Sequence, residues 1–194
     1  KKSLLQLIIA IAIAIFFFTT SSSAQTYILN EDFSSATGTT PPSGWSNINV
    51  QGTATDLWQF DNNSNRTVNY PIIGNFALFD SERNSGDSVP EKVTLESPYL
   101  DCSYSPNTLL YFNHEFVGGR NGKGILEVYN GSTWQIFTTF INSTNGVKSE
   151  VFNLSSYFGG VTNAKFRFTW EGDSSFYWAI DNIKIFAPLS RDVN

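Results

Sequence analysis

The sequence contains very few of the residues that build disulfide scaffolds and transition-metal centres. Its 194 residues include one cysteine, Cys102, one histidine, His114, and no methionine. A single cysteine cannot form an internal disulfide, and one cysteine with one histidine excludes a Cys/His zinc cluster and a multi-histidine metal centre. Any metal site in this chain is therefore expected to use oxygen ligands.

Charged residues are also scarce, at 15% of the chain against about 25% in an average soluble protein. Acidic side chains are in excess, and the formal net charge is -5. Proteins that bind nucleic acid need clustered Lys and Arg to neutralise phosphates, so nucleic acid is excluded as a partner. Ser, Thr and Asn supply the polar surface instead, which is typical of extracellular proteins.

The first 24 residues have the organisation of a secretory signal peptide. Two lysines are followed by an apolar run from Leu4 to Phe18, and small residues then lead to Ala24. The apolar run is about 15 residues long, whereas a membrane-spanning helix needs roughly 20. We therefore expect residues 1–24 to be removed, leaving a secreted or cell-surface protein with no membrane span; a retained membrane anchor is the alternative.

Beyond residue 24 the chain has ample material for a core but no convincing helical period. Hydrophobic residues make up 41% and aromatic residues 15% of the sequence. Short alternating segments separated by turn residues are typical of a sandwich or barrel. We expect one all-β domain over residues 25–188, with residues 189–194 as the start of a linker or a truncated C-terminus. Its expected strands are Tyr27–Phe33, Asp56–Phe60, Phe76–Asp80, Glu91–Glu96, Thr108–Val117, Gly124–Tyr129, Thr133–Phe140, Lys148–Asn153, Ala164–Trp170 and Phe176–Phe186.

The dipeptide Asn130-Gly131 predicts a hairpin between two of these strands. Asn-Gly best tolerates the two positive φ values of a type I′ turn, so the strand ending at Tyr129 should pair with the one beginning near Trp134. Residues 37–44 and 62–70 are rich in Thr, Pro, Asn and Ser and are expected to form loops. The whole pattern predicts a two-sheet antiparallel sandwich with its first and last strands close in space.

Three acidic residues share strand parity with apolar side chains and are expected to point into the core. Glu31 alternates in phase with Leu29 and Phe33, Asp80 with Phe76 and Leu78, and Asp181 with Ile183 and Ile185. An isolated buried carboxylate is costly unless it is paired, hydrogen-bonded or protonated. Oxygen ligands on a secreted chain favour calcium. The alternative is that one or more of these acids caps a turn in solvent.

The order of short motifs along the chain resembles that of the choice-of-anchor J and cleaved-adhesin group, which is related to the MAM domains of animal receptors. The motifs span most of the chain after residue 28: EDF at Glu31–Phe33, PPSGW at Pro41–Trp45, LW at Leu57–Trp58, FALFDSE at Phe76–Glu82, LESPYLDCS at Leu95–Ser103, LLYFNHEF at Leu109–Phe116, NGSTW at Asn130–Trp134, FNLSSYFGG at Phe152–Gly160, AKFRFTW at Ala164–Trp170 and WAIDNIKI at Trp178–Ile185.

The resemblance implies a jelly-roll β-sandwich in a secreted or surface protein of bacteria, especially Bacteroidetes, used as a non-catalytic module beside other domains of a longer chain. It also implies structural calcium held by acids at the matching positions Glu31, Asp80 and Asp181. Two features depart from the group. Its last motif is often a double acid, and here the second position is Asn182; the disulfides of the animal relatives are absent.

Catalytic signatures are missing from the sequence. His114 alternates in phase with the apolar residues Leu110, Phe112 and Phe116 and is expected in the core, and Cys102 is expected to be an inert buried thiol. No nucleophile elbow or His-Glu-x-x-His motif occurs. We therefore expect a non-enzyme: a secreted adhesion or accessory module that binds an extracellular protein or glycan. The alternative is a carbohydrate-binding module of a polysaccharide-degrading enzyme, which a planar row of exposed aromatic side chains would favour.

Overall fold

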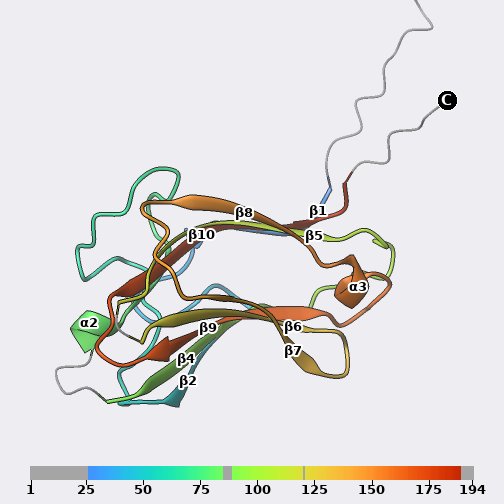
Figure 1. The fold of residues 1–194 in the computed structure, drawn as a ribbon. Helices are drawn as coiled ribbons and strands as arrows, with labels where there is room; N and C mark the ends of the chain where they lie inside the picture. The colour runs from blue at the N-terminus through green and yellow to red at the C-terminus, as the bar shows by residue number, and fades with distance from the viewer. Residues whose placement is uncertain (1–25, 85–88, 120, 189–194) are drawn as a thin grey trace, which may run out of the picture.

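The computed structural model describes residues 26–84, 89–119 and 121–188. The expected signal peptide at 1–24 and the segment 189–194 lie outside the described residues. Two antiparallel sheets face each other across a hydrophobic core (Figure 1). The prediction of an all-β, two-sheet antiparallel sandwich is confirmed.

Sheet A, the upper layer in Figure 1, contains both the first and the last strand. The last strand, β10, is central: it pairs with β1 and β3 along one edge and with β5 along the other, as the prediction of adjacent terminal strands requires. The edge strand β8 pairs with β5. The bounds are β1 Tyr27–Glu31, β3 Ala77–Asp80, β5 Leu109–Val117, β8 Lys148–Asn153 and β10 Tyr177–Phe186.

Sheet B, the lower layer, has the strand order β2-β4-β9-β6-β7, and all its pairs are antiparallel. Two helical turns lie in connections between strands. The bounds are β2 Ser46–Gln51, β4 Glu91–Glu96, β6 Lys123–Tyr129, β7 Trp134–Phe140 and β9 Lys165–Gly172 for the strands, and α2 Ser81–Asn84 and α3 Ser155–Phe158 for the helical turns.

Two strand predictions differ from the structure. Strand β2 was not expected, because its alternating apolar residues Ile48 and Val50 lie among Asn and Ser and are both exposed at the edge of sheet B. The segment Asp56–Phe60 was expected to be a strand, but it forms only an isolated bridge from Gln59 to Leu78. Its aromatic residues Trp58 and Phe60 are nevertheless buried, which explains the misleading apolar pattern.

The hairpin prediction is right about the pairing and wrong about the turn. Strands β6 and β7 pair, with Tyr129 opposite Trp134. Of the two residues in the Asn-Gly dipeptide, only Gly131 has a positive φ, at 88°. Asn130 acts through its side chain, whose Oδ1 accepts hydrogen bonds from the backbone N–H groups of Ser132 and Thr133. The turn is therefore not type I′, and the asparagine side chain helps to hold it.

The core between the sheets is dominated by aromatic side chains. Trp58, Trp170 and Trp178 are fully buried there together with Phe residues from both sheets. Each fully buried side chain of this size contributes about 1.5–3 kcal/mol of hydrophobic stabilisation. Gly124 on β6 shows how tight the packing is, since a Cβ atom at this position would lie 2.8 Å from the Trp178 ring.

A second, smaller cluster lies on the outer face of sheet A. Ile72 and Val68, from the long loop before β3, pack on Leu78 of β3 and on Tyr177 and Ala179 of β10. This loop therefore covers part of sheet A. The polar residues of β3 and β10 on that face are buried beneath it rather than between the two sheets.

Candidate functional site

Asp181 is buried as expected, but on the opposite side of sheet A from the predicted one. Trp178 and Ile180 face the core between the sheets, so alternation places Asp181 on the outer face with Ala179. A β-bulge then follows, and Asn182 adopts a positive φ of 55°. The extra residue reverses the alternation, which returns Ile183 to the core. The prediction that Asp181 shares the face of Ile183 was wrong because the sequence pattern does not reveal this bulge.

Glu31 lies near Asp181 at the end of β1, and Asp32 accompanies it. The pKa of Asp181 is raised to about 6 by burial, and the negative charges of Asp32 and Glu31 add to the increase. The pKa of Glu31 is also raised, again mainly by burial. Backbone N–H groups of Asn182 and Ile73 donate hydrogen bonds to the Asp181 carboxylate, at 2.7 and 3.4 Å. The structure thus brings two of the predicted acids together and adds Asp32, which strand parity did not single out.

A shallow hollow opens beside these acids. It is lined by residues of the β1 end, the loop before β3 and the β10 bulge, namely Asp32, Ser34, Ile73, Gly74, Asn75, Asp181 and Asn182. Asp181 itself is only 1% exposed, whereas Asp32 is exposed. Among the residues that the structure describes, no group of three or more His, Cys, Asp or Glu side chains is arranged as a metal centre.

Asp80, the third predicted acid, is buried in a different environment. It lies opposite Tyr177 at the start of β10, whereas Asp181 is four residues further along that strand. Two nitrogen atoms of Arg66 donate hydrogen bonds of 2.7 Å to its two carboxylate oxygens. Arg66 comes from the covering loop and also contacts Glu82. The charge of Asp80 is therefore compensated by an arginine that strand parity does not reveal.

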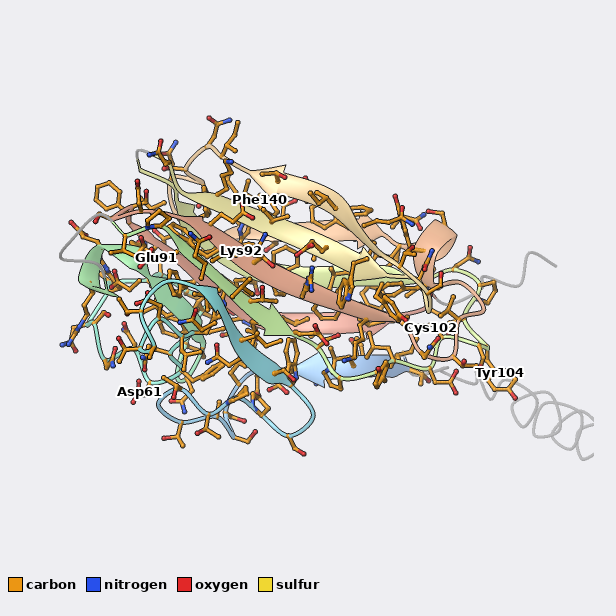
Figure 2. The ribbon with its side chains drawn as sticks, turned by 90° about the horizontal axis from the view of Figure 1, so that it is seen from below. Asp61, Glu91, Lys92, Cys102, Tyr104 and Phe140 are labelled. Carbon is orange, nitrogen blue, oxygen red and sulfur yellow. The ribbon has the colours of Figure 1, made fainter. Side chains whose placement is uncertain are left out.

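Several ion pairs and cation–π contacts lie on the outer face of sheet B, onto which Figure 2 looks and where it labels Lys92. Strand β9 creates this surface through strict alternation: Phe166, Phe168 and Trp170 face the core, and the intervening polar side chains face outward. At the end of the sheet nearer Tyr99, aromatic, basic and acidic side chains form a row across four strands. We call this row the aromatic–cation strip, and it consists of Glu96, Tyr99, Glu127, Tyr129, Trp134, Lys165 and Arg167.

Arg167 is held from two directions within the strip. Its Nε and Nη2 atoms each donate a hydrogen bond of 2.7 Å to the Glu127 carboxylate. Its guanidinium carbon also lies 4.2 Å from the centroid of the Trp134 ring. A bidentate carboxylate pair combined with a cation–π contact fixes both the position and the plane of the guanidinium.

Lys165 repeats this arrangement with a second pair of partners. Its Nζ donates a hydrogen bond of 2.6 Å to Glu96 and lies 4.1 Å from the centroid of the Tyr99 ring. Tyr99 is 67% exposed, so most of its ring is available to a ligand. Tyr129 lies opposite both Lys165 and Trp134, which makes the row continuous across β9, β6 and β7.

The pKa of Glu127 is lowered within the strip. Although burial alone would raise the pKa of Glu127, hydrogen bonds from Arg167 and Thr169 and the charge of Arg167 produce a net decrease. Thr169 also forms a buried hydrogen bond with Thr94 on the neighbouring strand, at 3.0 Å. The alternation of polar residues along β9 is visible in the sequence, but the partners depend on the cross-strand register, which the sequence does not display.

The structure places His114 and Cys102 in the core. The Trp178 indole Nε1–H donates a hydrogen bond of 3.1 Å to His114 Nδ1, and burial lowers the pKa of His114 to about 4. Cys102 is buried, and its pKa is raised to about 11, mainly by burial. A neutral, enclosed imidazole and a protonated thiol are suited to packing rather than to proton transfer or nucleophilic attack.

No helix within the described ranges is both long and apolar enough to cross a membrane. Comparison of the sequence with family models finds no match, and neither does comparison with curated proteins.

Solved structures do resemble this fold. The K3 cleaved adhesin domain of Lys-gingipain from Porphyromonas gingivalis matches with a TM-score of 0.59 and 13% identity, over 85% of this chain and 100% of that domain. TmCBM61, a carbohydrate-binding module solved with β-1,4-galactotriose, matches with a TM-score of 0.53 and 16% identity, over 86% and 100%. The xylan-binding domain of CBM 22 matches with a TM-score of 0.52 and 12% identity, over 85% and 96%. These TM-scores show a shared jelly-roll fold, and at such low identities they show the fold alone.

Proposed function

We propose that this domain is a non-catalytic module that binds an extracellular glycan through the aromatic–cation strip on sheet B. The observation that carries the proposal is the double fixation of Arg167, by the Glu127 carboxylate and the Trp134 ring. A rigid polar group beside aromatic surface is the combination that recognises a sugar, which has both apolar ring faces and hydroxyl groups.

The strip keeps hydrogen-bonding capacity after its internal contacts are made. A guanidinium has five N–H donors, and the pair with Glu127 uses two of them. An ammonium has three donors, and one of those on Lys165 is directed to Glu96. Because these groups are already held in place, a ligand would lose little affinity to the ordering of side chains.

The comparisons support the same class of function. The similar structures comprise an adhesin domain and modules whose ligands are galactotriose and xylan. On this proposal the chain belongs to the choice-of-anchor J type within that fold, is secreted after loss of residues 1–24, and acts beside other domains of a longer protein. A protein ligand is the competing form of the adhesion hypothesis, and it would engage the same exposed face without a requirement for sugar.

A structural calcium ion forms a separate part of the proposal. Glu31, Asp32 and Asp181 supply hard oxygen donors beside the hollow, although the described residues do not arrange three acids as a metal centre. Burial raises the pKa of Asp181 to about 6, and the negative charges of Asp32 and Glu31 add to the increase. Carboxylate oxygens are the ligands that Ca²⁺ prefers, and a bound Ca²⁺ would supply the positive charge that this group of acids lacks. We assign Glu31 and Asp181, with Asp32, to such a site. Asp80 does not fit it, because Arg66 occupies both of its oxygens.

A glycan array with the purified domain tests the proposed function. We expect retention of one or more extracellular polysaccharides and no release of products from peptide, ester or glycoside substrates. Steady hydrolysis that disappears when one acid is replaced would overturn the non-catalytic assignment. Binding to a protein with no glycan competition would favour the competing adhesion hypothesis.

A further inference from the structure

The aromatic–cation strip contains no uncompensated cation, and from this we infer that it selects neutral glycans over glycans that carry carboxylate or sulfate groups. The inference rests on the proposed function and deepens it by naming the class of ligand. Its basis is the ion pairing within the strip, which is independent of the fold comparison.

Both basic groups of the strip are matched by a carboxylate at hydrogen-bond distance. Lys165 Nζ lies 2.6 Å from Glu96 Oε1, and Arg167 Nη2 lies 2.7 Å from Glu127 Oε1. On the same face but outside the strip, Lys92 forms a third pair with Glu171, also at 2.6 Å. Two cations and two carboxylates leave the strip electrically neutral.

An acidic sugar would have to compete with these internal carboxylates. Glu127 reaches the guanidinium with two parallel hydrogen bonds, which is the geometry that an external carboxylate or sulfate would itself need. Glu127 is already in place within the same sheet, so its effective concentration is far above that of a soluble ligand. An incoming anion would also leave the displaced, part-buried Glu127 carboxylate without its partner.

A neutral sugar avoids both penalties. Its hydroxyl groups can accept from the unused N–H donors of Arg167 and Lys165, and can donate to lone pairs that remain on Glu96 and Glu127. The net charge of the whole chain also disfavours acidic glycans, because a charge of -5 repels polyanions at low ionic strength. Exposed Tyr99 supplies apolar surface that does not discriminate by charge.

Binding of two sets of polysaccharides tests this inference. The neutral probes are β-1,4-galactan, xylan and glucomannan; the acidic probes are polygalacturonate and heparin. We expect the wild-type domain to retain at least one neutral probe, and to bind each acidic probe about tenfold more weakly or not at all. A test of the pairing uses Glu127→Gln and, independently, Glu96→Gln, because each removes one carboxylate and frees one cation. Each should strengthen binding of an acidic probe by about three- to tenfold, with a larger effect at low salt.

Glu171→Gln is the matched control, since it makes the same charge change on the same face but outside the strip. It should leave acidic binding close to the wild-type value, and thermal melting of all three variants shows whether each remains folded. If the wild type binds acidic probes as well as neutral ones, or if Glu171→Gln enhances acidic binding as much as Glu127→Gln and Glu96→Gln, the inference is wrong while the proposed function stands. If the wild type retains no glycan of either set, the proposed function itself fails.

Discussion

Trp178 donates its indole N–H to Nδ1 of His114 across neighbouring strands β10 and β5, at 3.1 Å inside the aromatic core. The hydrogen bond requires Nδ1 to be unprotonated, so the neutral imidazole carries its proton on Nε2. Glu150 Oε1 lies 3.6 Å from that nitrogen. Burial nevertheless dominates and lowers the pKa of His114 to about 4.

This geometry predicts that His114 destabilises the fold in acid. Its folded pKa of about 4 is below the unfolded value of 6.5, so the unfolded state binds the extra proton first. The contribution is fully favourable above pH 6.5 and is lost progressively as pH falls toward 4. Replacing His114 with Gln, which keeps a hydrogen-bond acceptor, should remove up to about 3 kcal/mol of pH dependence across this window. Denaturant unfolding at several pH values gives the free energy of unfolding at each pH. If this free energy changes with pH in the same way for the wild type and His114→Gln, the assignment is contradicted.

Glu91, at the start of β4, should have the opposite pH dependence. Its pKa is raised to about 7, mainly by burial, and Ser81 Oγ–H donates a hydrogen bond to it. Because the folded pKa exceeds the unfolded value of 4.5, the favourable contribution is present below pH 4.5 and is lost as pH rises through 7. Glu91→Gln should therefore be more stable than the wild type at pH 8, by about 1–2 kcal/mol. The gain should shrink at pH 5; a variant that is less stable at pH 8 would refute this account.

Arg66 should contribute to stability through Asp80. Replacing Arg66 with Gln leaves the Asp80 carboxylate, which is 2% exposed, without its bidentate partner. We expect a loss of about 2–3 kcal/mol in the free energy of unfolding. Arg83→Gln is the matched control, because the Arg83 guanidinium donates a hydrogen bond to an exposed backbone carbonyl, that of Asn63, rather than to a buried carboxylate. Equal effects of the two substitutions would mean that the Asp80 pair contributes little.

Calcium binding should stabilise the folded domain if Glu31, Asp32 and Asp181 hold the ion. At a free concentration near 100 times the dissociation constant, the stabilisation would be about 2.7 kcal/mol, and a chelator should lower the melting temperature. Asp181→Asn should abolish the response to calcium, whereas Asp80→Asn should retain it even though that variant is less stable. Melting curves that are unchanged by calcium and by chelator would rule the ion out.

The strand positions of this protein follow largely from its sequence, because alternation and turn residues act locally. Strands β4 and β8 have the predicted bounds, and the β6–β7 hairpin forms where Asn130-Gly131 predicted it. The face on which Asp181 lies was not predictable, since a single residue, Asn182 at positive φ, reverses the alternation within β10. Bulges arise from the register between strands that are distant in the sequence, and a single-strand pattern does not contain that information.

The candidate site was harder to predict than the fold. The outward row of polar residues on β9 is visible as alternation, but the pair formed by Arg167 and Glu127 joins residues 40 positions apart. The same is true of Arg66 and Asp80, in which a loop residue compensates a strand residue. Long-range ion pairs depend on which strands are neighbours, so the sequence indicated the kinds of residue present and the structure was needed to show their partners.

Titration of the domain with soluble neutral oligosaccharides tests the central claim most directly, using galactotriose, xylo-oligosaccharides and mannohexaose in isothermal calorimetry. Trp134→Ala and Tyr99→Ala remove aromatic surface from the strip, and Tyr70→Ala removes a tyrosine that is 83% exposed on the loop associated with sheet A. The account predicts that both strip variants weaken binding by about tenfold or more, equivalent to about 1.4 kcal/mol, while Tyr70→Ala binds like the wild type. Unchanged affinity in both strip variants, with loss of binding in Tyr70→Ala, would contradict the account and move the binding site to the other face of the sandwich.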